Sequence, residues 1–128
     1  MHGEYHLSAM NASPAVLVLD DFPDAAEAIG VWFEMEGWRA FCVSTASEAL
    51  SLLSREEIAA LVIEPHLRGG SAMPVALAAR RLPKVPKLVA VTWSARSGDH
   101  IAYEPTPFDI NLTKPVSLSL LFELLTAS

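Results

Sequence analysis

The sequence is poor in cysteine, in basic residues and in long apolar runs. Cys42 is its single cysteine, which excludes an internal disulfide and suits a reducing compartment. Nine lysines and arginines stand against fifteen aspartates and glutamates, so the formal net charge is −6 and the surface repels a nucleic-acid backbone. No apolar stretch approaches the roughly 20 residues of a membrane span, and residues 1–14 lack the basic start and apolar run of a signal peptide. We therefore expect a cytoplasmic protein that binds neither nucleic acid nor membrane.

Motifs of nucleotide and zinc sites are also missing. Neither G-x-G-x-x-G nor G-x-x-x-x-G-K-[ST] follows an apolar run, which argues against a dinucleotide-binding Rossmann domain and a P-loop enzyme. The four histidines lack the spacing of a zinc site. Cys42 lies on an apolar run, where we expect an ordinary buried thiol.

What the sequence does contain is a regular alternation of short apolar runs and helical patterns. Slightly more than half of the 128 residues are apolar, which is enough for the core of one domain. Residues 1–13 show no periodicity and are expected to form a flexible arm, so the domain itself is expected over 14–128. The expected strands are 15–19, 39–43, 60–63, 88–91 and 110–113. The expected helices are 23–36, 46–53, 74–81, a short and poorly formed one within 95–109, and 118–125.

Local signals support these boundaries. Thr45 and Glu48 form a capping box before the second helix, Gly37 is placed to end the first, and Ser117 can cap the last. Five short strands that alternate with helices predict a parallel sheet covered on both faces. The expected fold class is α/β: a doubly wound, five-stranded (βα)5 domain of the flavodoxin-like type, with three α/β/α layers.

Polar residues stand at the ends of four of the five expected strands. Ligands of open α/β sheets bind outside the carboxyl ends of the strands, so these side chains are expected to meet at one edge. Carboxylate clusters suit Mg²⁺, while a lysine and a hydroxyl could hold an anion there. The alternative is that strand ends are polar because they meet solvent, which would make residue 64 a solvent-facing loop residue. The residues concerned are Asp20, Asp21, Glu64, Thr92 and Lys114.

In their order and spacing, these motifs resemble those of the response-regulator receiver domains, the CheY-like family. VLVLDDFPDAAEAI resembles the first strand, acidic pair and first helix of that family. LVIEPHLRGG resembles the third strand and phosphoacceptor loop. LVAVTWS resembles the fourth strand with its threonine, and NLTKPV resembles the lysine–proline pair. The resemblance covers about residues 14–126.

The resemblance implies a role in two-component, or phosphorelay, signal transduction. In this family a histidine kinase phosphorylates an aspartate at the end of the third strand, with Mg²⁺ bound beside it. By position, Thr92 and Lys114 would contact the phosphoryl oxygens. The metal ligands would be Asp20, Asp21, the side chain of residue 64 and the carbonyl of His66.

The chain departs from the family pattern at the positions that carry chemistry and switching. Glu64 replaces the phosphoacceptor aspartate, and its extra methylene moves the carboxylate outward by roughly 1.5 Å. A misplacement of about 1 Å can cost on the order of 10²-fold in rate. Trp93 replaces a small residue, as a lid on the site or merely as a half-exposed aromatic, and Asn111 replaces an inward-turning aromatic. Arg68, Ala72, Pro105 and Pro107 also depart from the family pattern.

The last helix carries two apolar faces. Leu120 and Leu124 form the outer face, which is either scattered surface leucine or a surface for a partner, including a second copy of the chain. The inner face, expected to pack on the sheet, consists of Leu118, Leu121, Phe122 and Leu125.

These departures predict a stand-alone, degenerate receiver (a pseudo-receiver) and not an enzyme. It would act by contact with a histidine kinase or another signalling protein and bind Mg²⁺ weakly. Glu64 would freeze the domain in one state or partly imitate a phosphorylated aspartate. Two alternatives stay open: a working Mg²⁺-dependent phosphoacceptor, and a hydrolase that uses the acidic edge for metal-assisted chemistry.

Overall fold

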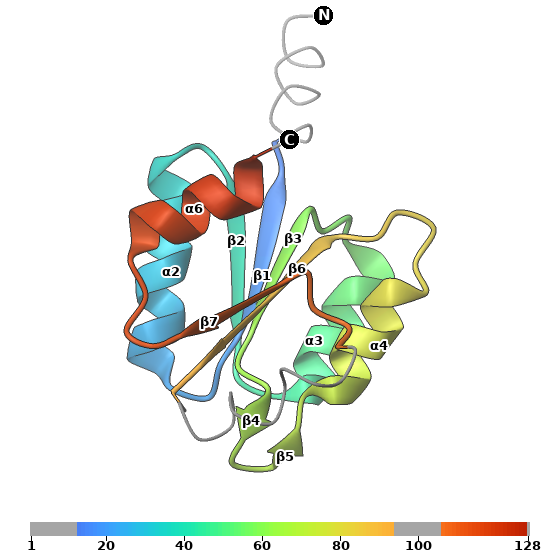
Figure 1. The fold of residues 1–128 in the computed structure, drawn as a ribbon. Coiled ribbons are helices and arrows are strands. Elements are labelled where there is room, and N and C mark those ends of the chain that lie inside the picture. The colour runs from blue at the N-terminus through green and yellow to red at the C-terminus, as the bar shows by residue number, and fades with distance from the viewer. Residues whose placement is uncertain (1–12, 94–105, 128) are drawn as a thin grey trace, which may run out of the picture.

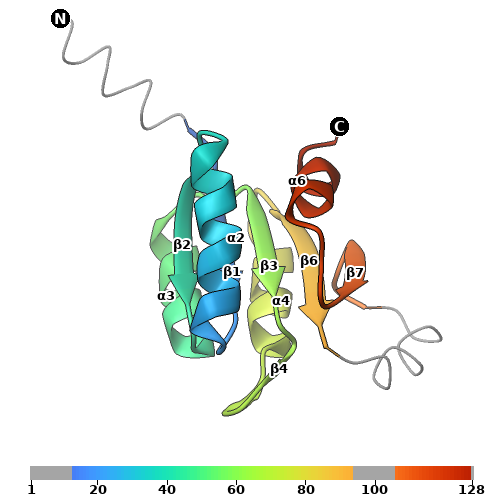
Figure 2. The same cartoon turned by 90° about the vertical axis from the view of Figure 1, so that its left-hand side faces the viewer.

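The computed structural model describes residues 13–93 and 106–127. In this part of the chain, five parallel strands form one sheet in the order β2-β1-β3-β6-β7. Figure 2 shows them side by side, from β2 on the left to β7 on the right. The sheet strands are β1 (Ala15–Leu19), β2 (Arg39–Val43), β3 (Ala60–Ile63), β6 (Lys87–Thr92) and β7 (Ile110–Thr113). The helices are α2 (Pro23–Met35), α3 (Ala46–Arg55), α4 (Met73–Arg80) and α6 (Leu118–Thr126).

The sheet lies between two helical layers (Figure 1), and the expected three-layer fold is confirmed. Successive strand residues point to opposite faces, so neighbouring residues of one strand enter different cores. Leu17 and Leu61 pack with α3 and α4 on one face. Val18 and Val62 pack with α2 and α6 on the other. There Phe33 of α2 meets Phe122 of α6 edge to face, with ring centroids 5.1 Å apart.

The structure contains the contacts that the sequence predicted at the ends of the helices. The Thr45 hydroxyl accepts a hydrogen bond from the Glu48 N–H at 3.2 Å, while Glu48 Oε1 accepts one from the Thr45 N–H. Ser117 Oγ accepts a hydrogen bond from the Leu120 N–H at 3.2 Å and caps α6. Gly37 follows the end of α2 with φ +91°, a conformation that favours glycine and stops the helix.

Some local details differ from the sequence prediction. The loop around Gly69 and Gly70 contains a short antiparallel hairpin, β4 (His66–Leu67) and β5 (Gly70–Ser71). Residues 106–109 are not helical, and the rest of the helix expected within 95–109 lies outside the described residues, as does almost all of the 1–13 arm. None of the described helices has the length and apolarity needed to cross a bilayer.

Candidate functional site

Charged residues and a threonine lie at the carboxyl end of the sheet, and their burial separates them from ordinary strand ends. Asp20 follows β1, Glu64 follows β3, and Thr92 ends β6. Asp20 and Glu64 are each 4% exposed, and Thr92 is 7% exposed. The alternative that residue 64 faces solvent in a loop is therefore wrong.

Lys114 reaches this end from beyond β7 and binds both buried carboxylates. Its Nζ donates a hydrogen bond to Asp20 Oδ2 at 2.7 Å and to Glu64 Oε1 at 3.1 Å. The Lys114 side chain is only 6% exposed, and its backbone N–H bonds the Thr92 carbonyl at 2.7 Å. We call Lys114, Asp20 and Glu64 the buried triad. An ammonium group between two carboxylates compensates charges that would be very costly to bury alone.

The remaining oxygen of each triad carboxylate has a backbone donor. Asp20 Oδ1 accepts a hydrogen bond from the Phe22 N–H at 2.9 Å. Glu64 Oε2 accepts one from the His66 N–H at 3.0 Å. All four oxygens are thus held by donors of the same chain, which fixes the orientation of both carboxylates.

Two aromatic rings flank the ammonium group on the solvent side. Lys114 Nζ lies 5.3 Å from the centroid of the Trp93 ring and 5.9 Å from that of Phe22, within the range of cation–π attraction. Trp93 is 58% exposed and Phe22 44% exposed. Sequence reasoning missed Phe22, although its place directly after the acidic pair was a usable signal.

The other predicted site residues do not join the triad. The Asp21 carboxylate accepts a hydrogen bond from the Arg68 backbone N–H. Asn111 is exposed on the edge strand β7, paired in register with Ala90. His66 is exposed and takes part through its backbone N–H.

The residues at this edge do not fit a magnesium ion as they are arranged. Mg²⁺ demands near-octahedral oxygen ligands at about 2.0–2.1 Å. Here the facing oxygens of Asp20 and Glu64 enclose the Lys114 ammonium group, and Asp21 bonds elsewhere. In the described ranges, no three His, Cys, Asp or Glu side chains are grouped as metal ligands.

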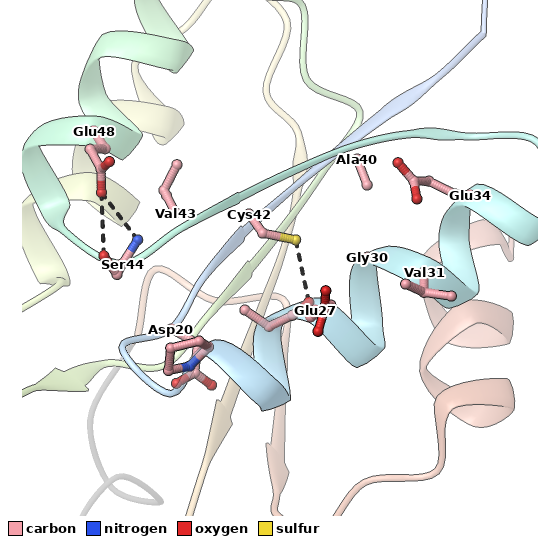
Figure 3. A pocket seen from close by; sticks show the side chains of 12 residues that line it. Asp20, Glu27, Gly30, Val31, Glu34, Ala40, Cys42, Val43, Ser44 and Glu48 are labelled. Atoms are coloured by element: carbon pink, nitrogen blue, oxygen red, sulfur yellow. Dashed lines mark hydrogen bonds between the residues drawn. The ribbon is translucent and has the colours of Figure 1, made fainter.

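A pocket of about 430 Å³ lies beside the triad, between α2 and the edge strand β2 (Figure 3). Cys42 opens onto it, and its thiol donates a hydrogen bond to the Ala26 carbonyl at 3.3 Å. The prediction of a buried Cys42 was wrong, because β2 is an edge strand and leaves the residue exposed. Partial enclosure of the sulfur raises the pKa of Cys42, and the carboxylates of Glu34 and Glu27 raise it further. A thiol with a raised pKa is a weak nucleophile at neutral pH.

Comparison with known proteins identifies the class. No family model matches the sequence. An uncharacterized 14.6 kDa protein from the sodA1 3′ region of Leptolyngbya boryana is 36% identical over 103 residues, 79% of each chain. A sensor protein from Polaromonas sp. JS666 is 27% identical with a TM-score of 0.75, covering 88% of this chain and 92% of its own. A CheY-like receiver domain from Methylobacillus flagellatus is 26% identical with a TM-score of 0.74, covering 91% and 98%.

The chain is therefore similar, in sequence and in fold, to the CheY-like receiver domains of response regulators, the modules of two-component signalling. The response regulator TrrA from Thermotoga maritima, solved with Mg²⁺ and BeF, shares the fold at 21% identity and a TM-score of 0.72, over 87% of this chain and 95% of its own.

Proposed function

We propose that this chain is a degenerate receiver that signals through protein contacts and accepts no phosphoryl group at position 64. The buried triad carries this proposal. Phosphoryl transfer needs a carboxylate oxygen free to align with the donor. Both oxygens of Glu64 are engaged, one with Lys114 and one with the His66 N–H. Attack by Glu64 would first have to break these bonds in an enclosed site.

The same contacts hold the domain in one state. Glu64 places one negative charge beside Lys114, where a phosphoryl group would bring between 1.5 and 2 charges. The imitation of a phosphorylated aspartate is therefore partial. Because this charge belongs to the side chain itself and not to a transferred phosphoryl group, the state that it stabilises does not depend on a kinase.

The contact surface in this proposal is the outer face of α6 together with β7. Leu120 is 45% exposed, and Leu124 is partly exposed and outside the core cluster. Leu121 and Leu125 of the same helix are buried, so the two faces are distinct. A histidine kinase or another signalling protein, or a second copy of the chain, would bind there. The domain carrying this surface extends over residues 14–128, with 1–13 as an arm.

Mg²⁺ and enzymatic activity have minor places in this proposal. An ion that uses Asp20 and Glu64 has to displace Lys114, so its binding is weak. A hydrolase would need the same carboxylates for its metal, although they already share an ammonium group. We therefore propose a binding module and not an enzyme.

Intact mass spectrometry after incubation with acetyl phosphate and Mg²⁺ tests the proposal. The wild type should gain no phosphoryl group. Glu64→Asp with Trp93→Ala restores the aspartate and removes the neighbouring ring, and any uptake should be confined to this variant. Trp93→Ala alone is the matched control. Rapid, stoichiometric phosphorylation of the wild type would overturn the proposal.

A further inference from the structure

We propose that Lys114 is the resident cation of this site: its ammonium group takes the place of a divalent ion, and shortening Lys114 creates a divalent-cation site. The inference deepens the proposed function, on which it rests, by stating what keeps the site in one state. It starts from the disagreement between the acidic edge and the magnesium ion that such an edge suggests.

The position of the ammonium group is the first argument. Lys114 Nζ lies between oxygens from the ends of two adjacent strands, Asp20 Oδ2 at 2.7 Å and Glu64 Oε1 at 3.1 Å. A cation that bridged these oxygens would occupy the same space. The ammonium group and the ion therefore exclude one another.

Charge balance is the second argument. Asp20 and Glu64 carry two negative charges, and Lys114 compensates one of them. All three side chains are at most 6% exposed. A divalent ion added beside Lys114 would leave an enclosed positive charge, which is costly to bury. Removal of Lys114 leaves two adjacent carboxylates without a counter-ion, a donor set that suits Mg²⁺ or Mn²⁺.

Tethering is the third argument. Lys114 is covalently part of the site, so it competes at a high effective concentration without a second molecule. Its backbone is held by the Thr92 carbonyl, and the rings of Trp93 and Phe22 lie over its ammonium group. Mg²⁺, by contrast, gives up its water reluctantly.

Thermal melting with and without millimolar Mg²⁺ tests the inference on the full chain. Lys114→Ala should gain a Mg²⁺-dependent rise in Tm of about 5 °C, the shift expected when the ion stands about tenfold above its Kd. The wild type should shift far less. Asp20→Asn in the Lys114→Ala background should remove the gain. Lys84→Ala, which breaks an exposed lysine–carboxylate pair, is the matched control and should gain nothing.

Amine labelling of the wild type gives a second readout that does not depend on the folding of a variant. An N-hydroxysuccinimide ester should modify exposed Lys84 readily and leave Lys114 protected, with or without Mg²⁺. If Lys114→Ala does not fold, this measurement decides alone.

Three results would overturn the inference: a wild type that Mg²⁺ stabilises as much as it stabilises Lys114→Ala, a folded Lys114→Ala that ignores Mg²⁺, or labelling of Lys114 that rises with Mg²⁺. None of them decides the central claim of the proposed function, which is that Glu64 takes up no phosphoryl group. A wild type that binds Mg²⁺ but takes up no phosphoryl group refutes only the inference.

Discussion

The two ends of the sheet carry ion pairs of almost the same length in different surroundings. At the carboxyl end, Lys114 Nζ lies 2.7 Å from Asp20, and the two side chains are 6% and 4% exposed. At the amino end, Lys84 Nζ lies 2.6 Å from Glu57, but these side chains are 83% and 68% exposed. Distance alone therefore says little about how much an ion pair contributes to the free energy of unfolding.

Solvent makes the difference. Water and salt screen an exposed pair, and holding two long side chains in place costs entropy, so such pairs contribute little. A buried pair has already lost its hydration, and removal of one partner leaves the other charge uncompensated. The amino end can thus lose the exposed Lys84–Glu57 pair with little effect, while the carboxyl end depends on its buried pair.

The largest expected effect comes from breaking the buried triad. Lys114→Met should lower the free energy of unfolding by about 3–5 kcal/mol, because Asp20 and Glu64 stay buried without a counter-charge. Urea denaturation measures this loss. Lys84→Met is the counterpart at the amino end and should leave the midpoint unchanged within error. Equal effects of the two substitutions would remove the distinction drawn here.

The next largest effect concerns binding. It tests whether the partner binds the outer face of α6 and not one of the two charged ends of the sheet. Leu120→Glu with Leu124→Glu should weaken partner binding or self-association by at least about tenfold, which is 1.4 kcal/mol. Light scattering and a pull-down measure the loss, with circular dichroism as the test of folding. Leu77→Glu on α4 replaces another exposed leucine and is the matched control. Unfolding of the double variant would assign these leucines to the core, and unchanged binding would move the surface elsewhere.

The smallest effect is a pH dependence at the amino end. Burial alone would raise the pKa of Asp109, but the Leu88 N–H and the Arg80 guanidinium outweigh it and lower the pKa of this carboxyl. Stability from Asp109 is therefore present above about pH 4, the ordinary range of aspartate, and is lost as the pH falls through its lower folded pKa. Denaturation midpoints below pH 4 should fall less steeply in Asp109→Asn than in the wild type. Parallel pH profiles would contradict this assignment.

Sequence reasoning succeeded where structure is local. The runs 15–19 and 60–63 predicted their strands because a strand buried on both faces is apolar throughout, and Thr45 marked a helix start through its own short-range hydrogen bonds. The principle that ligands of open α/β sheets bind outside the carboxyl ends of the strands also located the acidic edge. The prediction that Cys42 is buried failed, because the order of strands within the sheet decides which strand lies at an edge.

The contacts inside the site could not be predicted in detail for the same reason. Lys114 and Asp20 are 94 residues apart in the sequence, and Lys114 and Glu64 are 50 apart. Only the folded sheet determines that one ammonium group reaches both carboxylates. The turn of Asp21 toward the Arg68 N–H depends likewise on the path of the loop after β3.

The Lys114–Asp20 bond also acts as a non-covalent cross-link between the segments that follow the first and the last strand of the sheet in chain order. The loop that it closes contains every strand of the sheet except β1, which directly precedes Asp20. Strand β7 lies at the edge and pairs in the sheet only with β6. The Lys114 side chain, directly after β7, adds a bond to Asp20, which follows β1 on the far side of β3. Release of this one side chain would leave β7 and the α6 segment behind it held by fewer bonds. The triad therefore supports the position of the segment that carries the outer face of α6.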